Sequence, residues 1–152
     1  MTNNDVLRSI RYMLDMSEPK MVEVWQLAEM SIERGDIKDF LRDEEDEQYL
    51  PCDDALMIAF LNGLVTFKRG KNESSQPLPI EKMSNNLALK KLRVAFELKE
   101  DQMHEVFGNA DYEISKPELS AFFRKKGTDN YRPCGDQVLR YFLKGLTMHL
   151  RA

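Results

Sequence analysis

The residues best suited to covalent chemistry are two cysteines, Cys52 and Cys134. Each stands just before a predicted helix, where the helix dipole can lower the pKa of a thiol and make it reactive. A cysteine nucleophile normally works with a histidine base. The two histidines, His104 and His149, both lie in the second half of the chain and do not cluster with either cysteine in the sequence. The pattern therefore favours a simpler interpretation, in which each cysteine is a small buried residue beneath the helix that follows it.

Metal and cofactor chemistry have little support in the sequence. The cysteines and histidines show no CxxC or HxxxH spacing, so no zinc site is predicted. An acidic run, residues 43–47 (DEEDE), lacks the alternating oxygen ligands and central glycine of an EF-hand loop. The motifs GxGxxG, GxxxxGK[ST], GxSxG and HExxH do not occur. We therefore expect no metal and no cofactor, and a protein that binds a partner rather than one that catalyses a reaction.

The elements that position these residues come from a duplicated sequence. Shifting the chain by 82 positions aligns residues 3–70 with residues 85–152 without a gap, and 21 of the 68 pairs are identical. YLPCDD in the first copy falls on YRPCGD in the second, and FLNGL falls on FLKGL. The residues between the copies, 71–84, contain Ser and Pro without a helical apolar period, and they predict a linker.

Each copy is predicted to form four helices, because its apolar residues recur at three- and four-residue spacing and strand signals are absent. The predicted fold class is therefore all-α, with about eight helices in two tandem four-helix repeats. The first helix of each repeat is expected to begin at an asparagine cap, Asn4 or Asn86. The fourth helix is expected to begin with Asp54 or Asp136, whose carboxylate accepts backbone N–H bonds.

A glycine interrupts the fourth helix of each repeat, at Gly63 and Gly145. Glycine inside a helix costs about 1 kcal/mol relative to alanine, so its presence in both copies indicates a close approach of another backbone. We expect the two fourth helices to cross near these glycines.

Several polar or small residues are identical in the two repeats and are expected to be structural, although a binding surface is the alternative. In the structural interpretation, an arginine reaches the aspartate that begins the fourth helix, and the tyrosine hydroxyl closes the preceding loop. The identical pairs are Arg11 and Arg93, Arg42 and Arg124, Tyr49 and Tyr131, Cys52 and Cys134, Asp54 and Asp136, and Gly63 and Gly145.

Net charge differs sharply between the repeats. Residues 3–70 contain 8 basic and 15 acidic side chains, a net charge of −7, whereas residues 85–152 contain 12 and 9, a net charge of +3. In the second repeat, the helices expected at 101–110 and 116–126 have helix-turn-helix proportions. Nucleic-acid binding by the second of these helices is one hypothesis, although such helix pairs are also common in other helical proteins. The side chains that would face a partner are Lys116, Ser120, Arg124, Lys125 and Lys126.

The motifs NNLALKKLRVAFELK, KPELSAFFRK and CGDQVLRYFLKGL, with RGKNES before the linker, give the chain a resemblance to a known family. It resembles the YehS-like family of small bacterial proteins, which carries a domain of unknown function. The resemblance spans essentially the whole chain. It implies a bacterial cytosolic protein, and it implies no activity, substrate or catalytic residue.

No apolar run approaches the roughly 20 residues that a membrane-spanning helix needs, and residues 1–5 are polar, unlike a signal peptide. We therefore expect a cytoplasmic protein with no membrane association. The leading expectation is an uncharacterised interaction module that binds an unknown protein partner or associates with itself, through its acidic run and its basic repeat. Nucleic-acid binding is the first alternative. An enzyme with a Cys or carboxylate site between the repeats is the second.

Overall fold

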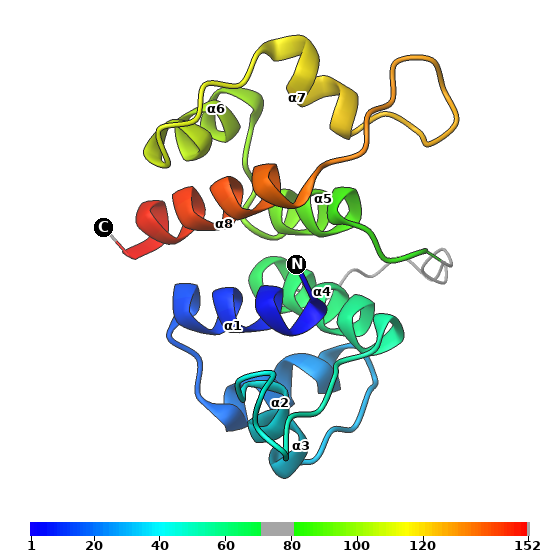
Figure 1. The fold of residues 1–152 in the computed structure, drawn as a ribbon, viewed down its shortest axis with the longest axis vertical. Coiled ribbons are helices and arrows are strands. Elements are labelled where there is room, and N and C mark those ends of the chain that lie inside the picture. Colours follow the sequence, from blue (N-terminus) through cyan, green and yellow to red (C-terminus); the bar gives the residue numbers. More distant parts are fainter. Residues whose placement is uncertain (71–80, 152) are drawn as a thin grey trace.

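The computed structural model describes residues 1–70 and 81–151 (Figure 1). The described residues form eight helices and no strand, which confirms the all-α prediction and its two four-helix repeats. Residues 71–80 of the predicted linker lie outside the described residues. The helices are α1 (Asn3–Leu14), α2 (Glu18–Leu27), α3 (Arg34–Phe40) and α4 (Asp54–Arg69), then α5 (Asn85–Ala95), α6 (Glu100–Asn109), α7 (Lys116–Phe122) and α8 (Asp136–Arg151).

The two repeats pack together reciprocally. Within each repeat the second helix lies on the fourth, α2 on α4 and α6 on α8. Between the repeats, the first helix of each lies against the fourth helix of the other, α1 against α8 and α5 against α4 (Figure 1). This exchange is what an approximate two-fold rotation between the repeats would produce. It leaves α3 and α7 at opposite ends of the long axis of the molecule (Figure 1).

Hydrogen bonds across the junction follow the same symmetry. Arg69, the last residue of α4, donates to the backbone carbonyl of Val94 at 3.2 Å. Its counterpart Arg151, the last residue of α8, donates to the backbone carbonyl of Tyr12 at 2.6 Å and lies over the Tyr12 ring. The two arginines are 82 positions apart in the chain, and so are the two residues whose carbonyls they contact; this is the shift that aligns the repeats. The duplication therefore extends to the contacts between the repeats.

The mid-helix glycines allow a close approach, but the predicted crossing of α4 and α8 is wrong. A Cβ added to Gly63 would overlap the backbone carbonyl of Val24 in α2, and one added to Gly145 would overlap that of Val106 in α6. Each glycine therefore allows the second helix of its own repeat to pack closely against the fourth helix. Because the close contact is with backbone rather than with a flexible side chain, neither position has space for a side chain.

Three predicted N-terminal caps, Asn4, Asn86 and Asp54, are also wrong. Thr2 and Ser84 cap α1 and α5, where their side chains accept the backbone N–H of Asp5 and Leu87. The fourth helices begin at Asp54 and Asp136 as predicted, but the cap of α4 is Asp53, which accepts the N–H of Leu56 at 2.8 Å.

The two first-turn aspartates have side-chain partners that are not arginines. Asp54 accepts the side-chain amide of Asn3 at 2.9 Å, and Asp136 accepts that of Asn85 at 2.8 Å. Asp136 also pairs with the amino group of Met1 at 2.6 Å, and this contact holds the pKa of its carboxyl below the usual value. The predicted contact between a shared arginine and either aspartate is therefore wrong.

A buried asparagine closes the loop that connects the third and fourth helices. The Asn4 side chain is 2 % exposed, and it donates to the carbonyls of Phe40 at 3.0 Å and Leu50 at 2.8 Å. Its oxygen accepts the backbone N–H of Cys52 at 2.9 Å. Three backbone groups on both sides of the loop are thus held by one amide, which fixes where the loop leaves α3 and enters α4.

The second repeat closes its loop in the same way. Asn86 donates to the carbonyls of Phe122 at 3.0 Å and Arg132 at 2.9 Å, and it accepts the backbone N–H of Cys134 at 2.8 Å. The shared tyrosines, Tyr49 and Tyr131, were expected to close these loops through their hydroxyl groups. In the described part of the chain, neither hydroxyl makes a hydrogen bond, so asparagine does what was assigned to tyrosine.

The shared first-helix arginines have different surroundings. Arg11 is exposed. Arg93 is half-buried, donates to the Leu98 carbonyl at 3.0 Å and lies over the Phe123 ring, 4.7 Å from its centre. None of the helices in the described ranges is long and apolar enough to span a bilayer.

Candidate functional site

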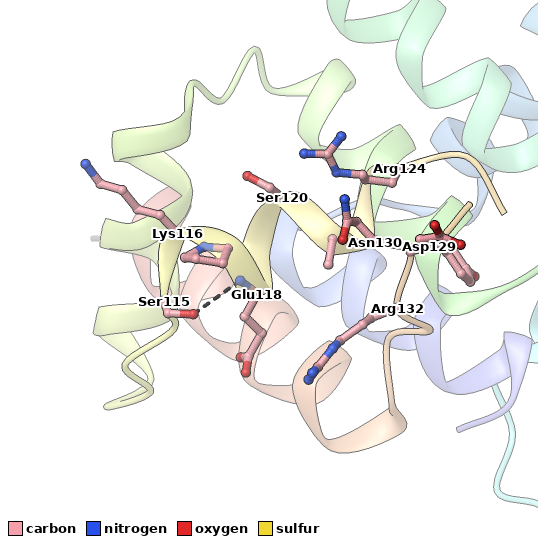
Figure 2. Close-up of a pocket in the computed structure, with 11 residues that line it drawn as sticks. Ser115, Lys116, Glu118, Ser120, Arg124, Asp129, Asn130 and Arg132 are labelled. Atoms are coloured by element: carbon pink, nitrogen blue, oxygen red, sulfur yellow. Dashed lines mark hydrogen bonds between the residues drawn. The ribbon is translucent and has the colours of Figure 1, made fainter. Parts of the chain in front are cut away.

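A cavity in the second repeat lies between α7 and the loop that follows it (Figure 2). Its volume is about 700 Å³, and we call it the α7 pocket. Three basic side chains contribute to its lining, together with two carboxylates and several hydroxyl or amide groups. The lining residues are Ser115, Lys116, Pro117, Glu118, Ser120, Ala121, Arg124, Asp129, Asn130, Tyr131 and Arg132.

The structure brings three of the five proposed partner-facing residues into this pocket. Lys116, Ser120 and Arg124 line it, but Lys125 and Lys126 do not. The reason is that α7 ends at Phe122 instead of continuing to residue 126, and the chain then turns back through the segment 125–128, where Thr128 N–H donates to the Lys125 carbonyl at 3.2 Å. Both lysines are exposed outside the pocket.

Arg132 was missed as a lining residue, although the aligned repeats contained a signal for it. The equivalent residue in the first repeat is Leu50, so the second repeat has gained a positive charge at this position. Asn130 and Asp129 were missed as well, because they come from the loop and have no helical spacing to indicate which way they face.

Arg42, the first-repeat equivalent of Arg124, is paired with two carboxylates. Arg42 Nε donates to Asp39 Oδ1 at 2.8 Å, and its Nη1 lies 3.3 Å from Asp46 Oδ2. This hydrogen bond to the Asp39 carboxylate raises the pKa of the Arg42 guanidinium above its usual value. The same arginine in the second repeat, Arg124, has Ala121 in place of one carboxylate.

The second carboxylate is also replaced, since Thr128 aligns with Asp46. Within residues 1–70 and 81–151, the side chains of Arg124, Arg132 and Lys116 make no hydrogen bond or ion pair. Figure 2 shows Arg124 and Arg132 on different sides of the pocket, with Ser120 and Asn130 nearer Arg124. Unpaired guanidinium groups bind carboxylates and phosphates through parallel hydrogen bonds, so the arrangement suits an oxyanion.

The two carboxylates that line the pocket do not outweigh the positive charge of its three basic side chains. Glu118 accepts the hydroxyl of Tyr112 at 3.0 Å, and its backbone N–H is bound by the Ser115 hydroxyl at 3.2 Å (Figure 2). Glu118 is therefore held between the start of α7 and the segment that precedes it. Asp129 is exposed on the loop.

The cysteines are in no position to act as nucleophiles. Cys52 and Cys134 are each 5 % exposed, and burial raises the pKa of both thiols to about 12. This is the opposite of the lowering that a helix dipole would give, because loss of water disfavours the thiolate more than the dipole stabilises it. His149 lies in the last turn of α8, whereas Cys134 precedes its first turn. Both cysteines are buried residues beside the fourth helix, as the simpler interpretation predicts.

The junction of the repeats contains two further cavities of about 520 and 370 Å³, between α1 and α8. No cysteine lines either of them, and the single carboxylate in their linings is Asp5. Asp5 accepts the backbone N–H of Thr2 at 2.9 Å and pairs with Arg8. This carboxylate completes the cap of α1, so the junction gives no support to the enzyme alternative.

Comparison with known proteins gives the same division of the chain. The family described as "Protein of unknown function (DUF1456)" matches residues 3–70 and again residues 85–152. The chain is similar to "Uncharacterized protein YehS" of Escherichia coli (strain K12), with 42% identity over 147 residues, which cover 96% of this chain and 94% of that protein. No solved structure matches the chain.

Proposed function

The chain belongs to the family of proteins of unknown function DUF1456, and from this premise we propose that it is a non-catalytic binding module of the bacterial cytoplasm. Its partner is a negatively charged macromolecule, which the second repeat binds at the α7 pocket. The observation that carries the proposal is the contrast between Arg42, paired with Asp39 and Asp46, and Arg124, which has no carboxylate partner among the described residues.

A second contrast supports the same surface. Arg132 adds a positive charge where the first repeat has Leu50, and Ser120 stands where that repeat has Lys38. The pocket therefore combines guanidinium groups with short hydrogen-bonding side chains. The equivalent surface of the first repeat instead has ion pairs between its own residues. A partner that supplies carboxylate or phosphate oxygens replaces the two aspartates that the second repeat lacks.

An acidic protein segment suits the pocket better than a nucleic acid does. Glu118 and Asp129 also line it, and a continuous phosphate backbone would have to pass them, whereas a short acidic segment can place its carboxylates at the guanidinium groups alone. Nucleic acid is the second candidate, and the exposed Lys125 and Lys126 beside the pocket favour it. Nuclease treatment separates the two candidates, because it destroys a nucleic acid and leaves a protein partner intact.

The experiment is a pull-down from native cytoplasm, with and without nuclease, that uses the tagged full chain as bait. We expect a partner that survives nuclease and is captured less by the Arg124→Gln/Arg132→Gln bait. Arg42→Gln is the matched control, because it makes the same change on the same scaffold where the arginine is already paired; this bait should retain the partner. Equal capture by the double variant and the wild type would exclude the α7 pocket as the binding site.

Nuclease sensitivity decides between the two candidates. If capture disappears with nuclease and still depends on Arg124 and Arg132, the nucleic-acid candidate replaces the protein partner. A mobility-shift assay at several salt concentrations then gives the number of phosphate contacts from the slope of affinity against salt.

A further inference from the structure

The two ends of the molecule carry opposite charge on the same structural element. Residues 33–50, which form α3 and its loop, contain three basic and eight acidic side chains, a net charge of −5. The equivalent residues 115–132, which form α7 and its loop, contain five basic and two acidic side chains, a net charge of +3. Figure 1 places α3 and α7 at opposite ends of the long axis. The molecule is therefore polar along its length.

The charge reversal falls on loops with the same backbone structure. In the first repeat, Asp46 N–H donates to the Asp43 carbonyl at 3.0 Å. The equivalent bond in the second repeat joins Thr128 to Lys125 at 3.2 Å. The second repeat thus has Lys125 where the first has Asp43, and Lys126 where it has Glu44. The same loop structure therefore presents carboxylates at the first-repeat end of the molecule and ammonium groups at the second-repeat end.

Three acidic side chains of the first loop are available to a partner. Glu44, Glu45 and Glu47 are exposed, and within the described ranges their carboxylates make no hydrogen bond or ion pair. The two aspartates of the run are used within the loop, because Asp43 accepts the Glu45 N–H at 3.0 Å and Asp46 accepts the Gln48 N–H at 2.8 Å. The loop is therefore held in shape by its aspartates while its glutamates point outward.

We infer that the segment bound by the α7 pocket is the acidic run, residues 43–47, of a second copy of this chain. This inference rests on the proposed function of the pocket and names its partner. The glutamates of the run supply carboxylates to Arg124 and Arg132, which have no such partner among residues 1–70 and 81–151. Because the two loops lie at opposite ends of the molecule, the run of one molecule meets the pocket of the next, and copies associate head to tail.

A head-to-tail contact has two consequences. It joins two different surfaces, so each molecule that binds leaves one pocket and one acidic run unused, and association continues beyond the dimer. It also brings opposite charges together at an exposed surface. Screening of such charges strengthens as the Debye length falls from roughly 30 Å at 0.01 M salt to about 3 Å at 1 M. Association should therefore weaken steeply with salt.

The test uses two full-length variants, each with one end disabled. In the first, Glu44→Gln/Glu45→Gln/Glu47→Gln removes three charges of the run and keeps the aspartates that shape it. In the second, Arg124→Glu/Arg132→Glu reverses the pocket and leaves the run intact. Sedimentation velocity at low salt measures the mass of the wild type, of each variant alone and of their equimolar mixture, with circular dichroism to establish that each variant is folded.

We expect the wild type to grow in mass with concentration at low salt and to return to 17.8 kDa at high salt. Each variant alone should stay at that monomer mass. The mixture should form a one-to-one dimer that grows no further, because it contains one intact run and one intact pocket. A charge reversal elsewhere, Arg11→Glu at an exposed position outside both ends, should leave association as in the wild type.

Two results would overturn the inference: a wild type that stays monomeric at every concentration at low salt, or a mixture of variants that fails to dimerise. If the wild type is monomeric while the pull-down still captures an acidic partner that depends on Arg124, the proposed function stands and this partner assignment is wrong. If the chain self-associates equally with Arg124 and Arg132 reversed, the contact between copies lies elsewhere and this inference is wrong, whereas the proposed function is decided by the pull-down.

Discussion

The two loops that connect the third and fourth helices are closed by the same bonds and carry opposite charge. In each repeat an asparagine holds three backbone groups of the loop, Asn4 in the first and Asn86 in the second. Around this common frame, Arg42 is paired with two aspartates, whereas Arg124 faces a cavity. The comparison teaches that the bonds which build the repeat were retained after duplication, while the residues at its surface changed.

This comparison sorts substitutions into two classes. Changes at shared positions inside the repeat should have similar effects on both halves of the molecule. Changes at positions that have diverged should affect stability in one repeat and binding in the other. The predictions that follow test this division, beginning with the largest expected change in the free energy of unfolding.

The largest effect is expected at the mid-helix glycines. Gly63→Ala and Gly145→Ala each place a Cβ against the carbonyl of the adjacent helix, and we expect each to lower the free energy of unfolding by about 3 kcal/mol. Thermal or denaturant unfolding measures the loss. Gly108→Ala is the control: it lies in α6 with nothing within 4 Å of its added Cβ, and it should be neutral or stabilise by up to about 1 kcal/mol. Full stability of either α4 or α8 variant would show that the close approach is not needed.

The next effect concerns the asparagines. Asn4→Ala leaves two carbonyls and one N–H without their partner at a site with almost no water, so we expect a loss of about 3 kcal/mol. Asn86→Ala removes the same three bonds at a half-buried site, where water can replace some of them, and about 2 kcal/mol is expected. Urea denaturation of both variants gives the comparison. A larger loss in the second repeat would contradict the assignment of these costs to burial.

The cysteines should behave alike at high pH. In the folded protein their pKa is about 12, above the ordinary value of 9.0, so the folded state keeps its thiol protons after the unfolded state has lost them. The stability that the buried thiols contribute is therefore fully present below about pH 9 and falls as the pH rises towards 12. Unfolding of the wild type and of Cys52→Ala/Cys134→Ala across this range isolates the thiols, and a difference that stays constant with pH would argue against buried neutral thiols.

The smallest effect separates the two shared arginines. Arg42→Gln should lower the melting temperature slightly, because it breaks two ion pairs at a partly exposed site. Arg124→Gln should leave the melting temperature unchanged and reduce partner capture, since its guanidinium has no partner in the described part of the chain. Differential scanning calorimetry and the pull-down measure the two outcomes. Equal changes in melting temperature would remove the distinction between a structural and a binding arginine.

Much of this organisation was predictable because it is local or repeated. The apolar spacing gives eight helices, and the alignment of residues 3–70 with residues 85–152 gives the two repeats. The same alignment also contains the exchange of Asp39 and Asp46 for Ala121 and Thr128, which leaves an arginine unpaired. The helical spacing and the alignment of charged residues can be seen without knowing which distant residues are in contact.

The remaining features depend on partners that are distant in sequence. A glycine inside a helix indicates a close approach, but it does not identify the approaching helix, and so Gly63 was assigned to the wrong neighbour. Asn4 resembles a helix cap because asparagine often is one, whereas its partners are carbonyls 36 and 46 positions away. Lys125 and Lys126 fall within the helix predicted at 116–126, but α7 ends at Phe122 and the chain turns back beyond it.

The reciprocal packing of first and fourth helices also determines how the molecule unfolds. Since α1 lies on α8 and α5 lies on α4, removing either repeat would expose an apolar face of the other. The contact between Arg151 and Tyr12 spans 139 positions, so it closes one of the longest loops in the chain and should form late in folding. Duplication has therefore doubled the length of the sequence without doubling the number of cooperative units, and both halves should melt in a single transition.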